Sequence, residues 1–432
     1  MCTSLAIAVL LATAAADGRS NATQLPAVEL PAVQAPVASV IAIAETNMSL
    51  LDTERDAAAR TAMGRGLTWL RAHTSENGGW LSDLRAAPTD ATTSLLSPVG
   101  AAVSALGLKS FVQAGVDPTT DPMLRALVAN LLARQETDGR FDDGNLSTYV
   151  TAAVVTALAS LPPSERVATA MHNGVESLRQ LQWDETDNVD PSLDWYGGAG
   201  YGKHGRPDLS STQWLLEGLH AAGDCSDSRG PFGCDCDNDP ARQRAIAFLT
   251  RCQNAPSNPA DWAGTDGGFV YTAAGGGESM ASQAAGEGRY GETMPEGEAR
   301  SLRSYGSMTY AGYKSLLFAG LSPDDPRVQA ALDWIRAHWT MTSNPGMGKQ
   351  GWFYYLHGLA RAMTAGGHTT LMDADGVDHD WRAELADTLV EAQQPDGSWV
   401  NEESRWLEGN AELATIYAVL TLQETLKPPP MR

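Results

Sequence analysis

The stretch from Gln393 to Trp399 is the feature that most constrains how this chain can fold. It lies between two segments whose apolar residues recur at helical spacing. Pro395 and Gly397 end the first helix and turn the chain. Gln393 can bond backbone groups left free at the helix end, and Trp399 offers a flat face that packs on the turn. The stretch therefore predicts a clasp between a helix that ends and one that begins.

The same pattern recurs about six times, at the roughly 40-residue spacing that is typical of two-helix repeats. The clearest second copy is Gln135-Glu136-Thr137-Asp138-Gly139-Arg140-Phe141. The less complete copies, all in phase, are Asn77-Gly78-Gly79-Trp80, Asp194-Trp195-Tyr196-Gly197-Gly198, Asp266-Gly267-Gly268-Phe269 and Lys349-Gln350-Gly351-Trp352. We therefore expect an all-α fold of successive helical hairpins. A generic helical solenoid with glycine-aromatic turns is the alternative.

The string Gln393-x-x-x-Gly397-x-Trp399 resembles the Gln-Trp motif of the prenyltransferase and squalene-oxidase repeat family. The resemblance covers roughly Met63 to Leu426. In this family the repeat builds the α/α toroid of squalene and oxidosqualene cyclases and of the protein-prenyltransferase β subunit. The resemblance implies a double ring of six hairpins, the type shared by terpenoid cyclases and protein prenyltransferases. It also implies a ligand cavity on the axis, near the N-terminal ends of the inner helices.

Two segments precede the predicted toroid, which we place at residues 61–427. Residues 1–16 contain the apolar run Leu5 to Leu11 and then Ala14-Ala15-Ala16, which is typical of a signal peptide cleaved near Ala16. The run has no Lys or Arg before it, so a disordered apolar N-terminus is the alternative. Residues 17–60 are rich in Ala and Pro and predict a flexible linker. We expect a secreted protein, periplasmic or extracellular.

Composition narrows the classes of partner. The 432 residues are 43% hydrophobic and 19% charged, as in ordinary globular proteins. A net charge of -22 argues against nucleic acid and anionic lipid as partners, because both would be repelled. No later segment has the roughly 20 uncharged apolar residues of a transmembrane span. The sequence carries no signal for an oligomeric state.

Four cysteines remain after signal cleavage: Cys225, Cys234, Cys236 and Cys252. An even number in an exported chain predicts one or two disulfide bonds. Of the three possible pairings, the one that joins Cys234 to Cys236 is the least plausible because its loop is so tight. A metal site with Asp235, Asp237 and Asp239 is the rival, but the spacing matches no standard zinc pattern. We expect disulfide bonds, no metal and no cofactor.

The signature residues of the activities known in this family are missing. Squalene-hopene cyclases protonate their substrate with an Asp-x-Asp-Asp motif, whereas Asp373-Ala374-Asp375-Gly376 and Asp235-Cys236-Asp237-Asn238 lack the adjacent acids and precede outer helices. We interpret the acids from Asp373 to Asp380 as turn and N-cap residues, with a calcium loop as the alternative. Cys234-Asp235-Cys236 differs from the zinc-binding Asp-x-Cys of protein prenyltransferases. The thioester motif Gly-Cys-Gly-Glu-Gln is absent.

Polar and aromatic residues gather at one phase of the repeat, between the clasp and the first turns of each inner helix. Because a closed ring brings equal phases together, we predict that they line one ligand-binding pocket. These residues are Asp194, Tyr196, Asp208, Gln213, Tyr305, Tyr354, Tyr355, Glu408 and Glu412.

Aromatic side chains suit a hydrocarbon or a carbocation, and equally a sugar ring. The sequence therefore indicates a squalene-cyclase-like protein that binds or converts an isoprenoid or other apolar ligand. If it is an enzyme, it is an isomerase or transferase of the terpenoid cyclase or prenyltransferase type. The alternatives are a non-catalytic exported module that binds a glycan or a protein, and an α/α-barrel carbohydrate-active enzyme with Glu408, Glu412 or Asp208 as acid and base.

Overall fold

A computed structural model describes residues 37–75, 79–81, 91–141, 146–223, 239–293 and 300–428; for residues 37–52 and 91–98 it describes only the course of the helix. The chain divides into two units, Met1–Leu50 and Leu51–Arg432. Helix α1 (Val37–Ala72) begins in the first unit and continues into the second, which holds every other described helix and strand.

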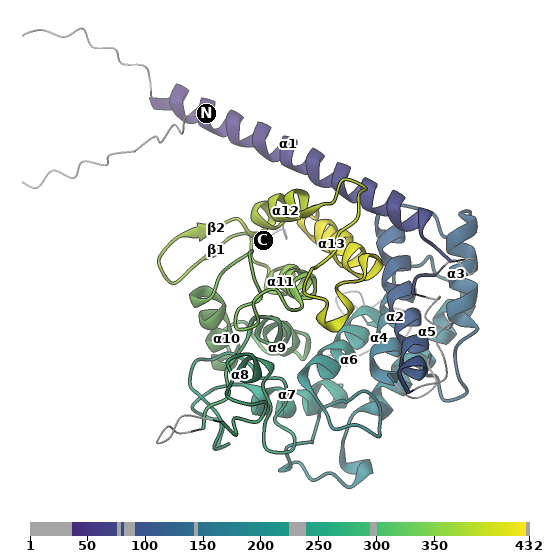
Figure 1. The fold of residues 1–432 in the computed structure, drawn as a ribbon, viewed down its shortest axis with the longest axis vertical. Coiled ribbons are helices and arrows are strands. Elements are labelled where there is room, and N and C mark those ends of the chain that lie inside the picture. Colours follow the sequence, from purple (N-terminus) through teal and green to yellow (C-terminus); the bar gives the residue numbers. More distant parts are fainter. Residues whose placement is uncertain are drawn as a thin grey trace, which may run out of the picture. The chain divides into compact units, whose positions relative to one another are not determined.

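Successive helices of the second unit pair as an outer and an inner member (Figure 1). The outer members are the C-terminal part of α1, then α3 (Pro122–Leu132), α5 (Glu165–Leu181), α7 (Pro240–Cys252), α10 (Pro326–Ala337) and α12 (Trp381–Ala392). The inner members are α2 (Ala91–Gln113), α4 (Ser147–Leu158), α6 (Leu209–Ala222), α9 (Gly306–Phe318), α11 (Trp352–Ala365) and α13 (Ala411–Thr425). The short helix α8 (Met280–Ala284) lies in the insertion before α9.

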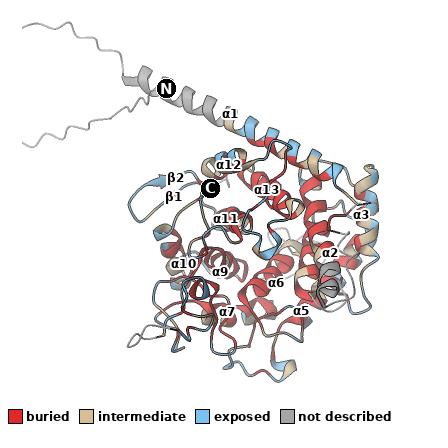
Figure 2. Ribbon diagram, in the orientation of Figure 1, coloured by how far each residue is buried: buried red, intermediate tan, exposed pale blue. Residues whose placement is uncertain are grey.

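The inner helices close a ring. Each contacts the next in the order α2, α4, α6, α9, α11 and α13, and α13 contacts α2. Figure 2 shows the described residues of these helices mostly buried, as expected for helices covered on both sides. The predicted α/α toroid is therefore confirmed.

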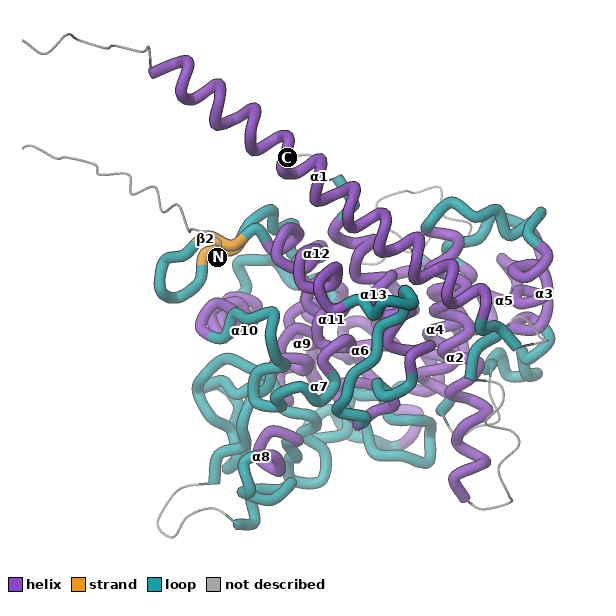
Figure 3. The backbone as a smooth tube through the Cα atoms, turned by 45° about the horizontal axis from the view of Figure 1, so that its top comes forward, coloured by secondary structure: helices purple, strands orange, loops and turns teal. Residues whose placement is uncertain are grey.

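Helices make up most of the described chain (Figure 3). The strands β1 (Leu371–Met372) and β2 (Asp378–His379) form one small antiparallel hairpin, with Leu371 opposite His379. The 3₁₀ helices η2 (Glu185–Asp187) and η4 (Arg405–Leu407) lie in loops. Asp380 caps the N-terminus of α12 and the Asp373 side chain bonds its own turn, in line with our interpretation of these acids.

Four repeated glutamines each join one repeat to the next. Gln393 donates from Nε2 to the Gly397 carbonyl at 2.9 Å and to the Ala62 carbonyl of α1 at 2.8 Å, which links the last repeat to the first. Gln135, Gln182 and Gln253 make the same two bonds, to Gly139 and Ala170, to Gly197 and Ala241, and to Gly267 and Arg327. The four glycines have φ between 82° and 98°, which disfavours any other residue.

In four clasps the backbone of the aromatic residue is held by a hydroxyl of the following inner helix. Trp399 is fully buried, and its backbone N–H donates to the Thr415 Oγ1 atom at 2.9 Å. Equivalent bonds join Trp80 to Ser104, Phe141 to Thr151 and Phe269 to Thr309. These hydroxyl residues therefore occupy equivalent positions in four inner helices.

Two expectations change in the structure. Residues 37–60, which we predicted as linker, lie in α1. The prolines that suggested a linker, Pro26, Pro31 and Pro36, all precede Val37, and the Ala-rich sequence after them favours a helix. The predicted signal peptide lies outside the described residues. None of the described helices is long and apolar enough to cross a membrane.

The disulfide prediction is wrong for Cys252, which is a free, fully buried cysteine. It ends helix α7, where its side chain packs in the hydrophobic core. Cys225, Cys234 and Cys236 lie outside the described residues, in the connection before α7.

Candidate ligand cavity

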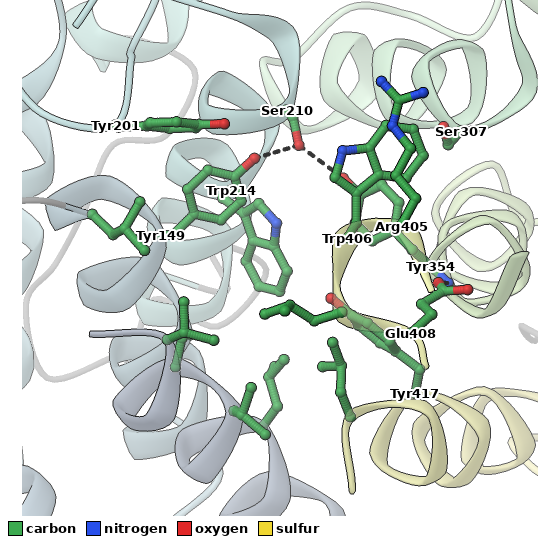
Figure 4. A pocket seen from close by; sticks show the side chains of 18 of the residues that line it. Tyr149, Tyr201, Ser210, Trp214, Ser307, Tyr354, Arg405, Trp406, Glu408 and Tyr417 are labelled. Carbon is green, nitrogen blue, oxygen red and sulfur yellow. Dashed lines mark hydrogen bonds between the residues drawn. The ribbon is translucent and has the colours of Figure 1, made fainter. Parts of the chain in front are cut away.

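A cavity of about 440 Å³ lies inside the ring and receives residues from every inner helix. Figure 4 shows Tyr149, Trp214, Tyr354 and Tyr417 arranged around it. Its other aromatic residues are Tyr201, Tyr271, Tyr305 and Trp406, and its aliphatic residues and methionines are Val99, Ala102, Val103, Leu106, Leu146, Val150, Ala153, Met280, Met308, Leu407 and Leu413. The cavity is thus mainly apolar and aromatic.

Hydroxyl groups form a polar path along one side of the cavity. Tyr149 donates from its hydroxyl to the Ser210 Oγ atom at 2.6 Å, and that atom lies 3.2 Å from the Tyr354 hydroxyl (Figure 4). Burial raises the pKa of Tyr149 above its usual value, and it raises the pKa of Tyr354 to about 12. Both phenols are therefore neutral near pH 7 and can act as hydrogen-bond donors.

Glu408 is the carboxylate among the described lining residues, and it accepts hydrogen bonds from the N-terminus of α11. It accepts from the backbone N–H groups of Phe353 at 3.1 Å and Tyr354 at 2.7 Å, and from Asn401 Nδ2 at 2.8 Å. The N-cap residue of α11 is Gly351, which offers no side chain, so Glu408 supplies the missing acceptor. Burial raises the pKa of Glu408.

Asp208 is the N-cap of α6 and lies behind the cavity wall. Its carboxylate accepts from Ser211 N at 2.7 Å and from Ser211 Oγ at 2.9 Å. Burial raises the pKa of Asp208 to about 7, against the effect of these donors. Asp208 therefore has an altered proton affinity but does not line the cavity.

The other residues that we predicted to line the pocket differ in where the structure places them. Tyr305 lines the cavity together with Tyr354 and Glu408. Gln213 lies below it and donates to the Tyr354 hydroxyl at 3.1 Å. Glu412 accepts from Leu81 N at 2.7 Å in the first turn of α13 and does not line the cavity.

Asp194, Tyr196 and Tyr355 also do not line the cavity. Asp194 accepts from Gly275 N at 2.8 Å, and the Tyr196 hydroxyl donates to Glu185 at 2.6 Å. Tyr355 is buried in the core, where its hydroxyl donates to the Thr340 carbonyl at 2.8 Å. The structure thus brings three of the nine predicted residues to the cavity wall; ligand binding by any of them stays a prediction.

The sequence of this chain also matches the model of a known protein family. The model of the squalene-hopene cyclase C-terminal domain matches residues 28–275, more than half of the 432 residues. The chain belongs to the squalene-hopene cyclase C-terminal domain family.

Several solved structures show a distant similarity to this cyclase-family chain. Type II terpene cyclase MstE from Scytonema, without ligand, is 16% identical, with 76% of this chain and 98% of that chain covered and a TM-score of 0.30. A variant of MstE in complex with merosterolic acid A is 18% identical, with 75% and 98% covered and a TM-score of 0.31. A protein from Actinoplanes is 18% identical, with 69% and 97% covered and a TM-score of 0.38. No curated protein matches the chain.

Sequence reasoning missed part of the cavity wall of this cyclase-family chain. Besides the four hydroxyl residues named above, Thr212 accepts from the backbone N–H of Ala199, next to a clasp, at 3.0 Å. The residue two positions before each of these five hydroxyl residues lines the cavity. These lining residues are Ala102, Tyr149, Ser210, Ser307 and Leu413, before Ser104, Thr151, Thr212, Thr309 and Thr415. The distance from the clasp to its hydroxyl residue varies from 10 residues at Phe141 to 40 residues at Phe269, so the spacing along the chain gave no signal for this face.

A cluster of buried charges lies below the cavity of the cyclase-family toroid. Glu217 accepts from Lys314 Nζ at 2.5 Å and from Arg361 Nε at 3.1 Å, and Arg361 also reaches Glu424 at 3.2 Å. Lys109 is buried beside this cluster, and burial lowers its pKa to about 8. The axis of the toroid is thus apolar near the N-terminal ends of the inner helices and charged further along.

Proposed function

We propose that this chain binds an isoprenoid or another apolar ligand in the central cavity. The composition of the wall carries this proposal, because eight aromatic side chains and a larger number of aliphatic ones surround about 440 Å³ of space. Ligand sites of this kind are concave and mostly apolar, with a few polar groups that orient the ligand. Ser210 and the hydroxyls of Tyr149 and Tyr354 would supply these polar groups.

The proposal does not include protonation by an Asp-x-Asp-Asp acid. At the start of α6 the chain reads Asp208-Leu209-Ser210-Ser211, which has serines in place of the two adjacent acids of that motif. Glu408 bonds the N-terminus of α11 with both oxygens. The described wall therefore supports binding, or a conversion that needs no strong carboxylic acid.

A carbohydrate-active enzyme is the alternative activity. Glycoside hydrolysis canonically requires two carboxyl groups about 5–10 Å apart on either side of the bond that breaks. Among the described lining residues Glu408 is the carboxylate, and Asp208 and Glu412 do not line the cavity. This arrangement favours the apolar ligand over the glycan.

Mass spectrometry of ligands extracted from the purified native protein tests the proposal. We expect an apolar molecule in equimolar amount, and a recovered oligosaccharide would contradict the proposal. A titration of the protein with farnesol, followed by tryptophan fluorescence, gives a second readout, because Trp214 lines the cavity. Ala153→Phe should fill part of the cavity and weaken farnesol binding. Ala133→Phe, on the exposed end of α3, is the control that should leave it unchanged.

We also infer that the chain is exported after cleavage near Ala16. The apolar run from Leu5 to Leu11 and the small residues after it support this inference. Expression of the full sequence followed by N-terminal sequencing tests it. A mature chain that begins near Asp17 is expected, and retention of Met1 in the exported fraction would contradict it.

A further inference from the structure

The mouth of the cavity carries an excess of positive charge. Arg289 and Arg405 are the cationic residues among the described lining residues, and Glu408 is the anionic one. Glu408 is 1% exposed, whereas Arg405 is half-buried and the side chain of Arg289 is 42% exposed. The described lining residues therefore present a positive charge at the mouth, in a chain whose net charge is -22.

Arg405 bonds only neutral groups among the residues described. Its guanidinium donates to Gln350 Oε1 at 2.7 Å and to Gln283 Oε1 at 3.2 Å, and it lies 3.5 Å from the Met280 sulfur. No carboxylate of the described ranges lies within 4.0 Å of it. Its charge is thus not neutralised by an ion pair there.

Arg289 shares one carboxylate with a second arginine. The guanidinium groups of Arg206 and Arg289 both pair with Glu278, which is fully buried. The Arg289 carbonyl accepts from Ser279 N at 2.9 Å, which places this arginine beside Met280 and thus beside the contacts of Arg405. The two arginines therefore lie at the same part of the mouth, around the start of α8.

The backbone at the mouth is also unusual. Trp406 and Leu407 have φ values of 56° and 67°, a left-handed conformation that is costly for residues other than glycine. Their side chains are 45% and 40% exposed and line the cavity. The Arg405 guanidinium stacks over the Trp406 ring at 4.6 Å from its centroid (Figure 4). The surrounding structure thus holds a cation and an apolar surface together at the opening.

From these contacts we propose that the ligand is an amphipathic carboxylate, with its apolar chain in the cavity and its carboxylate bound by Arg405, assisted by Arg289. The inference rests on the proposed function. A guanidinium can bind a carboxylate with two parallel hydrogen bonds, and such charged bonds are stronger than neutral ones. The carboxylate would compete with the Gln350 and Gln283 side chains for the N–H donors of Arg405. Arg405 would then give up only hydrogen bonds to neutral amide groups.

A matched pair of probes tests the head group. Farnesoate and farnesol share one chain and differ in the carboxylate, so their affinities isolate its contribution. We expect farnesoate to bind about ten times more tightly than farnesol at low salt, and the ratio to fall as salt is added. Arg405→Gln should remove most of this ratio, because it should weaken farnesoate binding far more than farnesol binding. Arg405→Lys, which keeps the charge but not the paired donors, should retain part of it.

Arg336→Gln is the control, because it removes the same charge from an exposed ion pair on α10. A loss of farnesoate affinity in this control as large as in Arg405→Gln would overturn the inference, since it would show a general effect of charge. Equal binding of both probes, unchanged in Arg405→Gln, would overturn the head-group inference but leave the proposed function intact. If neither probe binds and no apolar molecule is extracted, the proposed function fails as well.

Discussion

The glutamines that join neighbouring repeats allow a matched test of what holds the ring together. Gln182 and Gln253 are fully buried, whereas Gln135 and Gln393 are half-buried. Methionine is unbranched and of similar length, so Gln→Met at each position removes the two donated bonds with little change in shape. The acceptor carbonyls are the same kind of group at all four sites, and the sites differ in how far the glutamine side chain is exposed to water.

The structure gives the expected magnitudes. A buried carbonyl that loses its donor costs about 1–3 kcal/mol, so two such losses cost about 4 kcal/mol. The Oε1 atoms of Gln182 and Gln253 are themselves buried without a partner, so removing one returns about 2 kcal/mol. We expect a net loss of about 2 kcal/mol at these two sites. Gln135 and Gln393 already expose part of their side chains to water, so their bonds are exchanged for bonds to water at a lower cost, and we expect about 1 kcal/mol or less.

Urea unfolding followed by far-ultraviolet circular dichroism measures these differences by linear extrapolation, provided the slope stays constant. Gln394→Met is the control, because this exposed neighbour should change the free energy of unfolding by less than about 0.5 kcal/mol. Costs at Gln135 and Gln393 equal to those at the buried sites would refute the reasoning from water access. Four variants indistinguishable from the control would show that the clasp bonds contribute nothing.

The charged cluster supports two further predictions. Glu217→Gln should lower the free energy of unfolding by about 3–5 kcal/mol, because Lys314 and Arg361 lose their shared buried carboxylate, whereas Glu176→Gln in a partly exposed pair should cost under about 1 kcal/mol. A similar loss in both variants by urea unfolding would contradict this. Lys109→Met should stabilise the fold by about 3 kcal/mol at pH 7, since the folded-state pKa of Lys109 is lowered from 10.5 to about 8. Between these two pH values the unfolded chain binds more protons, so the stability of the wild type rises with pH and the gain of the variant disappears. A gain that stays constant up to pH 10.5 would contradict this assignment.

The ring itself could be predicted from the sequence because its determinants are local. Gln393, Gly397 and Trp399 act within one turn, and repetition of that turn at a constant spacing leaves few folds other than a chain of hairpins. The structure adds the second partner of each glutamine, a carbonyl on the next outer helix. Ala62 and Gln393 are bonded because the ring closes, and no local pattern predicts that bond.

The direction of each side chain was decided by the tertiary structure. Tyr354 and Tyr355 are neighbours at the predicted phase, but successive helical residues point about 100° apart. Tyr354 therefore faces the cavity, whereas Tyr355 faces the core. Equal phase in the repeat locates a turn of helix, and only the packing of that helix in the ring selects which residue of the turn faces the axis.

The buried charges on the axis of the ring also could not be placed from the sequence. Glu217, Lys314 and Arg361 come from α6, α9 and α11, and each is an isolated charge in an otherwise apolar helix. The sequence alone determined that these helices are mostly apolar and hence buried. Ring closure decided that the three charges meet, because opposite charges removed from water are stable only when the fold brings them within hydrogen-bond distance.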